Sequence, residues 1–334
     1  MKKTLVLVLA AALAVVWGFA GTAAAKKFKV SMVTDVGGVN DESFNQSAWE
    51  GLKRAEKELG VKVGYKESRQ DADYAPNMET LTDANNDLIW GIGFLMADAI
   101  KATAQINPDQ KYGIIDFFYG PETPQNVACA VFQEEQPSFL VGYIAGKMTK
   151  TNKVGFIGGI KFPLIQKFEY GYMAGVKLAN PDCEILSQYA ESFTDAAKGK
   201  AIANNMYQQG ADIVFHAAGG VGDGLIEAAK EKNKWAIGVD KDQNSLAPDN
   251  VLTSAMKRVD NAVFSIVKQL TEGKFNGGKS VVYNLSNEGV GIAPSSSKHV
   301  PKAILDEVDG LIAKVKAGEI VVPSTEETYK AFIK

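Results

Sequence analysis

Six groups of residues in this chain could bind a small polar ligand, and each follows an apolar, strand-like run. They are Asp35 with Phe44 and Asn45, Asp116 after KYGIID, Phe168 beyond VGFIGG, Gly219 and Gly220 after DIVFHAA, Asp240 after WAIGVD, and Lys257 after LTSAM. Carboxylates and amides direct hydrogen bonds, while aromatic faces stack on a ligand ring. A single Asp after a strand could simply cap a helix. Six groups at equivalent ends of strands favour a shared cleft.

Residues 30–51, VSMVTDVGGVNDESFNQSAWEG, show this pattern most fully. An apolar strand leads into a loop rich in Asp, Asn, Ser and Gly, and a helix begins near Phe44. In open α/β sheets, helix N–H groups and loop side chains converge at the carboxyl ends of the strands. The stretch therefore predicts one side of a ligand site, with Phe44 available for stacking.

The elements that must position these residues alternate along the chain as strand and helix. The first series predicts strands at 28–34, 62–67, 88–93, 111–115 and 127–132, with helices at 43–59, 74–84 and 97–106. This alternation is typical of a mainly parallel sheet with helices on both faces.

A second, similar series begins near residue 134. It predicts strands at 153–157, 184–189, 213–217, 235–240 and 251–254, and helices at 137–148, 163–180, 195–209 and 224–232. A helix at 258–272, a strand at 279–284 and a last helix at 301–316 follow. We expect two doubly wound α/β lobes, residues 26–133 plus 258–287 and residues 134–257 plus 288–334. Three crossings between them would form a hinge.

Composition excludes several classes of protein. The formal net charge is −3, and it is two units more negative without Lys2 and Lys3. No basic stripe interleaves with aromatic residues, so nucleic acid is a poor partner. Cys129 and Cys183 show no metal-binding spacing with the two histidines, so no zinc site is expected. We expect both cysteines to be free and buried.

The first 25 residues read as an export signal. Lys2 and Lys3 precede an apolar run over 4–19, and Ala23–Ala25 supply small residues for cleavage. A retained anchor is the alternative, but the apolar core is short for a spanning helix. No cysteine lies near the cleavage point, so we expect no lipid attachment there.

Enzymatic alternatives have weaker support. GGVGDG at 219–224, with Asp240 beyond it, only partly resembles a dinucleotide-binding motif. The chain has no GxSxG or HExxH motif and no plausible Ser/His/Asp order. His216 within a strand is more simply a core residue. No cofactor is expected.

Several blocks together resemble the basic membrane protein (Bmp) family of solute receptors, the purine-nucleoside-receptor-like components of ABC importers. These blocks are VTDVGGVNDESFNQSAWEGL, GFLMADAI, SFLVGYIAG, VGFIGGIKFPLIQKFEYGYMAGVK, ESFTDAAKGKAIA, FHAAGGVGDG, IGVDKDQ and LTSAMKRVDNAV. The resemblance covers nearly the whole chain after residue 25. It implies a type I periplasmic binding protein fold.

The resemblance also implies roles for particular residues. A purine base would lie between Phe44 and a second ring, for which Phe168, Phe193 and Phe215 all remain candidates. Asp35 and Asn45 would contact the ligand, and Asp116 would accept hydrogen bonds from the base. Asp240 and Lys257 would hold the ribose hydroxyls, with a main-chain contact near Gly220.

The implied function is a monomeric receptor that diffuses freely in the periplasm, binds adenosine, guanosine or inosine and delivers it to an ABC permease. The alternatives are an exported nucleoside-processing or NAD-dependent enzyme, or a chemosensory receptor of the same fold. The absence of a helix-turn-helix segment disfavours a repressor.

Overall fold

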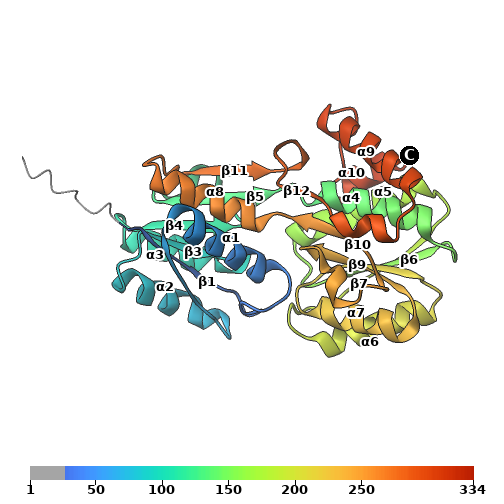
Figure 1. The fold of residues 1–334 in the computed structure, drawn as a ribbon, viewed down its shortest axis with the longest axis horizontal. Coiled ribbons are helices and arrows are strands. Elements are labelled where there is room, and N and C mark those ends of the chain that lie inside the picture. The colour runs from blue at the N-terminus through green and yellow to red at the C-terminus, as the bar shows by residue number, and fades with distance from the viewer. Residues whose placement is uncertain (1–26) are drawn as a thin grey trace, which may run out of the picture.

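The computed structural model describes residues 27–334, and the strands there form two six-stranded sheets, one in each of two lobes (Figure 1). The first sheet has the order β11-β5-β4-β3-β1-β2, and all its pairs are parallel. Its strands are β1 (Lys29–Val33), β2 (Lys62–Lys66), β3 (Leu88–Gly91), β4 (Lys111–Ile115), β5 (Val127–Phe132) and β11 (Lys279–Tyr283). The predicted export signal lies outside the described residues.

The second sheet has the order β12-β10-β9-β8-β6-β7, and only the β10–β12 pair is antiparallel. Its strands are β6 (Lys153–Gly158), β7 (Glu184–Tyr189), β8 (Ile213–Ala217), β9 (Trp235–Asp240), β10 (Val251–Lys257) and β12 (Val290–Ile292). Strand β8, IVFHA, is buried along its whole length and is apolar except for His216, as expected of a parallel strand covered by helices on both faces.

Helices pack in pairs on the sheets, and close contacts at glycines set their spacing. The first lobe has α1 (Phe44–Leu59), α2 (Tyr74–Asp83), α3 (Ala97–Ile106) and α8 (Val259–Thr271); the second has α4 (Glu135–Met148), α5 (Pro163–Ala179), α6 (Ala196–Gln208), α7 (Val221–Lys232), α9 (Lys302–Lys316) and α10 (Glu326–Phe332). A Cβ on Gly175 would lie 2.0 Å from the Phe139 carbonyl oxygen. Helices α4 and α5 can therefore approach closely only without a side chain there.

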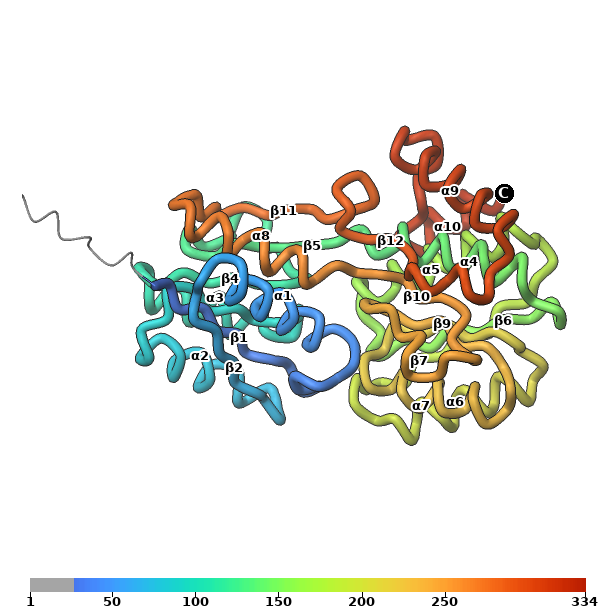
Figure 2. The backbone as a smooth tube through the Cα atoms, viewed as in Figure 1, coloured from blue at the N-terminus to red at the C-terminus, as the bar shows by residue number. Residues whose placement is uncertain are grey.

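The chain crosses between the sheets three times, after β5, after β10 and after β11 (Figure 2). These crossings agree with the expected fold of two lobes. The lobe boundaries placed at residues 133/134, 257/258 and 287/288, and the hinge itself, stay predictions. Cys129 and Cys183 are both free and buried, as expected. Within residues 27–334, no helix is both long enough and apolar enough to span a membrane.

The predicted elements are confirmed with few changes. Helix α7 begins at Val221, a turn earlier than the predicted residue 224, and β10 runs on to Lys257. The short strand β12 and helix α10 were not predicted, so the helix at 301–316 is not the last. Asp195 caps α6, because its side chain accepts the Lys198 N–H.

Candidate ligand-binding site

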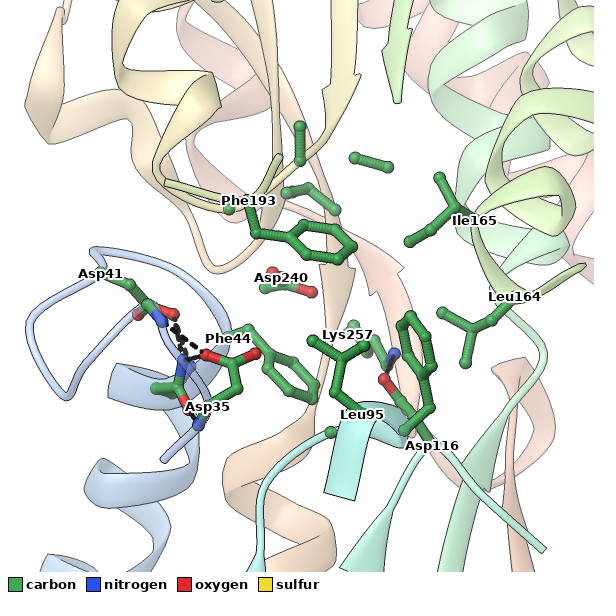
Figure 3. A pocket seen from close by; sticks show the side chains of 18 of the residues that line it. Asp35, Asp41, Phe44, Leu95, Asp116, Leu164, Ile165, Phe193, Asp240 and Lys257 are labelled. Atoms are coloured by element: carbon green, nitrogen blue, oxygen red, sulfur yellow. Dashed lines mark hydrogen bonds and ion pairs between the residues drawn. The ribbon is translucent and has the colours of Figure 1, made fainter. Parts of the chain in front are cut away.

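A cavity with about 610 Å³ of empty volume lies between the two lobes (Figure 3). The first lobe contributes Asp35, Gly37, Asp41, Phe44, Asn45, Gly93, Phe94, Leu95 and Asp116; the second contributes Leu164, Ile165, Phe168, Phe193, Ala217, Ala218, Gly219, Gly220, Val239, Asp240 and Lys257.

Strand order explains why these residues meet. In the first sheet the order reverses between β1 and β3, and in the second sheet it reverses between β6 and β8. Chain segments leaving neighbouring strands in opposite directions open a crevice at the carboxyl ends. Asp35 and Gly93 follow β1 and β3, while Gly220 follows β8. The cavity therefore lies where the two crevices face each other.

Asp41 is a structural residue of this site. Its carboxylate accepts the backbone N–H groups of Ser43, Asn45 and Gln46 at 2.8–3.0 Å, which caps the start of α1. The Asn45 amide donates to Asp41 and also to Asp35 Oδ1, at 2.7 Å. Asp35 Oδ1 accepts the Gly37 N–H as well. Asp35 is thereby held by one oxygen, and its Oδ2 is left for a ligand.

Lys257 is the only cation that lines the cavity in the part of the chain described, and it lies between two carboxylates. Its Nζ donates to Asp116 Oδ2 at 2.6 Å and lies 3.1 Å from Glu134 Oε1. Glu134 also accepts from Lys167, at 3.0 Å. The Lys257 ammonium lies 5.0–5.6 Å from the ring centroids of Phe44, Phe132 and Phe168, which adds cation–π attraction.

Asp116 and Asp240 end their strands in a left-handed backbone conformation. Their φ angles are +69° and +64°, values that are costly for residues other than glycine. Such strain is concentrated at functional sites, where the surrounding structure holds it. Asp116 Oδ1 is buried and has no hydrogen-bond partner within residues 27–334. An unpaired acceptor beside a cavity indicates a missing donor.

Phe44 and Phe193 enter the cavity from different lobes, and their rings lie on opposite sides of it in Figure 3. The Phe193 ring packs directly against the backbone of Gly159, where a Cβ would lie 2.2 Å from the ring atom Cε1. Phe94 packs edge-on against Phe193 and stacks on Phe162, with ring centroids 4.4 Å apart. The two facing rings could hold a flat ligand ring between them.

Burial shifts the acidity of the cavity carboxylates. Desolvation raises the pKa of Asp35 to about 6 and that of Asp240 to about 7. Desolvation also raises the pKa of Asp116 to about 6, although Lys257 opposes this rise. For Lys257, burial favours the neutral amine, but Asp116, Glu134 and Asp240 outweigh it and raise the pKa above its usual value.

Residues 28–326 match the family described as ABC transporter substrate-binding protein PnrA-like. The chain belongs to the Bmp family of ABC transporter substrate-binding proteins. It is 42% identical over 310 residues to Basic membrane protein A of Borreliella burgdorferi, covering 92% of this chain and 91% of that protein. It is 40% identical over 359 residues to the ABC transporter nucleoside-binding protein BmpA of Lactococcus lactis subsp. cremoris, covering 97% and 100%.

A solved ABC transporter solute-binding protein from Aeropyrum pernix K1 has the same fold, with a TM-score of 0.82 and 30% identity over 91% of this chain and 96% of that one. The predicted family and the two-lobe type I binding-protein fold are therefore confirmed. The family description makes this chain a substrate-binding protein of an ABC transporter, and the Lactococcus relative is named as nucleoside-binding.

In this Bmp-family chain, nine of the ten residues predicted as ligand-binding line the cavity, and Phe215 does not. Phe215 is completely buried in β8, and its ring packs on Phe156 and Tyr172 at 5.6 and 5.2 Å. Side chains alternate along a strand, so this position points into the core beneath α5 and not into the cleft. Phe215 is therefore the wrong choice for the second ring.

Sequence reasoning missed the apolar part of the lining. Phe94 and Leu95 follow β3, and Leu164 and Ile165 open α5. The signal was present in GFLMADAI and IKFPLI, where large apolar residues follow directly on a strand end. From the sequence alone, such residues could equally belong to the hydrophobic core. Whether they line a cavity depends on where the opposite lobe lies.

Proposed function

We propose that this substrate-binding protein binds a purine nucleoside between its lobes and delivers it to the membrane permease of an ABC importer. The observation that carries the proposal is the pairing of two facing rings, Phe44 and Phe193, with free carboxylate oxygens around them. The rings suit a purine base, and the acceptors suit the N–H and O–H donors of a nucleoside. The name of the Lactococcus relative, a nucleoside-binding protein, agrees with this ligand class.

Three carboxylates that line the cavity each have an oxygen left to accept a hydrogen bond. Asp35 Oδ2, Asp116 Oδ1 and Asp240 Oδ1 accept no hydrogen bond from residues 27–334. We assign Asp116 to N–H groups of the base and Asp240 to ribose hydroxyls, with Asp35 and Asn45 as further contacts of the first lobe. A ligand with donors at three separate points, as in a nucleoside, would satisfy all of them.

Phe193, and not Phe168, is the second ring in this proposal. Phe168 is only 3% exposed, whereas Phe44 and Phe193 are partly exposed, so little of the Phe168 ring is open to a ligand. Lys257 has three N–H donors. One donates to Asp116, and Glu134 Oε1 lies 3.1 Å away as an ion-pair partner. A remaining N–H could reach a ribose oxygen, with the main chain at Gly220 nearby.

The charge of the cavity favours an uncharged ligand. Four lining carboxylates, Asp35, Asp41, Asp116 and Asp240, face one lining cation, Lys257. A phosphate group would therefore meet like charges in the cavity. We infer that nucleoside 5′-monophosphates bind far more weakly than nucleosides. Closure of the lobes about the ligand would follow as a population shift, since both sets of contacts exist only in the closed form.

Native mass spectrometry of protein purified without refolding tests the ligand class. We expect an added mass equal to one nucleoside, because a tight ligand survives gentle purification. A bound sugar or amino acid would contradict the proposal.

Incubation with inosine separates receptor from enzyme: a receptor returns inosine intact, whereas released hypoxanthine would show catalysis. Periplasmic export after cleavage near Ala25 remains part of this proposal, and N-terminal sequencing of the secreted protein tests it.

A further inference from the structure

One buried amide outside the ligand cavity joins the two lobes. Gln243 begins the 3₁₀ turn η4 (Gln243–Leu246), directly after β9, and is 2% exposed. Its Nε2 donates to the carbonyl oxygen of Glu42 in the first lobe, at 3.1 Å. Glu42 adjoins Ser43, whose hydroxyl donates to Asp240 in the cavity. The contact therefore lies beside the ligand site without lining it.

The second lobe fixes the orientation of this amide. Gln243 Oε1 accepts the Val239 backbone N–H at 3.0 Å, and a backbone N–H can only donate. His216 Nε2 also lies 3.0 Å from Oε1, so this ring nitrogen must carry its proton. Burial lowers the pKa of His216 to about 4, which keeps the ring neutral. With Oε1 occupied twice, Nε2 must point across to Glu42.

The ring of His216 is itself held in place. A Cβ on Gly222, in the first turn of α7, would lie 1.9 Å from Cε1 of the imidazole. Glycine at this position lets the helix backbone press against the ring. The neutral His216 ring can then donate to Gln243 Oε1 from a fixed position. This gives a role to a histidine that does not line the ligand cavity.

We propose that Gln243 is a positioning residue for lobe closure, in which His216 and Val239 aim its amide so that it donates to the Glu42 carbonyl only in the closed state. The part that concerns ligand affinity rests on the proposed nucleoside function. The bond stabilises the closed form without touching ligand. Its loss shifts the population towards open lobes and lowers the affinity for any ligand that requires closure.

Gln243→Glu tests this directly, because it changes only the donor. One carboxylate oxygen can still accept from His216 and Val239, while the other faces the Glu42 carbonyl as a second acceptor. We expect inosine, guanosine or adenosine to bind at least 10-fold more weakly than to the wild type at pH 7.5. At pH 5 the buried carboxyl is protonated and its O–H restores the donor. The ratio of variant to wild-type Kd should then fall below about 3.

Comparison with the wild type at each pH removes the effect of other groups that titrate nearby. The charged and titratable groups around η4 and its partner loop are Asp41, Glu42, Glu50, His216, Asp223, Asp240, Lys241, Asp242 and Lys298. Gln243→Leu lacks the donor but cannot titrate, so its Kd ratio should stay raised at both pH values. Lys241→Gln is the matched control: it removes an exposed pair with Glu50 across the same boundary, and its Kd should stay within about 2-fold of the wild type.

An interlobe distance measurement keeps this proposal separate from the ligand class. Spin labels on Glu58→Cys in α1 and Lys230→Cys in α7 report the separation of the lobes without any ligand. Gln243→Glu should shift the distance distribution towards longer values at pH 7.5 and less so at pH 5. If no nucleoside binds the wild type, the proposed function fails while this readout still decides the role of Gln243. An unchanged distribution, or a Kd ratio below 2 at pH 7.5, would overturn it.

Discussion

The Ser43 hydroxyl donates to Asp240 Oδ2 at 2.5 Å, which joins the start of α1 in one lobe to the end of β9 in the other. Ser43 occupies the cap position of α1, yet its side chain makes no capping hydrogen bond. The Asp41 carboxylate caps the helix instead, by accepting its first backbone N–H groups. The hydroxyl is therefore free to bond a cavity carboxylate across the lobes.

Ser43→Ala should weaken nucleoside binding with little effect on folding. The lost bond goes to a charged group, and such bonds contribute about 1.5–3 kcal/mol. We expect the Kd measured by calorimetry to rise about 10- to 100-fold, while the melting temperature of the ligand-free protein changes by a few degrees at most. A large fall in ligand-free stability with unchanged Kd would show that the hydroxyl serves the fold and not the closed site.

Gly159→Ala should disturb the stacking ring from outside the cavity. The added methyl group would overlap Phe193, whose Cε1 lies 2.2 Å from the ideal Cβ position. We expect the Kd for nucleosides to rise about 10-fold, close to the effect of Phe193→Ala. Because both changes act through one ring, the double variant should lose little more than either single variant. Additive losses would mean that Gly159 affects binding by another route.

Lys257→Met should destabilise the protein even without ligand. The change leaves Asp116 and Glu134 buried with one partner fewer, and breaking a buried pair by removing one member costs about 3–5 kcal/mol. Urea unfolding of the ligand-free protein measures the loss. Lys302→Met, which removes a highly exposed partner of Asp306, is the matched control and should cost less than about 1 kcal/mol. Equal losses would show that Lys257 does not hold these carboxylates.

Stability and binding should depend on pH in opposite directions. Burial raises the pKa of Asp35 and Asp116 to about 6 and of Asp240 to about 7, against 3.8 in an unfolded chain. Between about pH 4 and these values the folded state holds protons that the unfolded state has released. The free energy of unfolding of the ligand-free protein therefore falls as pH rises through this window.

His216 opposes this trend, because burial lowers its pKa from 6.5 to about 4 and the unfolded chain binds its proton first. Three carboxylates outweigh one imidazole, so we expect the ligand-free melting temperature to rise from pH 7.5 to pH 5.5. Asp240→Asn should flatten that rise. Nucleoside affinity should instead decrease as the pH falls below about 7, since protonation of Asp240 and then of Asp35 and Asp116 removes acceptors. A melting temperature that falls steadily from pH 7.5 to 5.5 would contradict these assignments.

Much of the fold was predictable, because hydrophobic runs, and the polar residues and glycines that follow strands, are local signals in the sequence. The end of β10 was not, since Lys257 is polar in sequence and becomes buried only through Asp116 and Glu134. The short strand β12 depends on its antiparallel partner β10, a contact that no local pattern encodes. Tertiary partners decide such elements.

The candidate site was predictable to the same degree. Residues that follow strand ends could be named, because parallel strands gather their carboxyl ends at one edge. The choice between Phe193 and Phe215 required the direction of each side chain and the position of the opposite lobe. The contact between Gln243 and Glu42 spans 201 positions and involves a backbone carbonyl, so side-chain chemistry in the sequence carries no sign of it.

Equilibrium titration of ligand-free protein with nucleosides tests the central claim most directly. Calorimetry with adenosine, guanosine and inosine, run beside their 5′-monophosphates and ribose, measures both the ligand class and the effect of cavity charge. We predict one site per chain with a Kd in the micromolar range or tighter for at least one purine nucleoside. The matching monophosphate should bind at least 100-fold more weakly. Absence of binding by all three nucleosides, or equal affinity for a nucleoside and its monophosphate, would contradict the account.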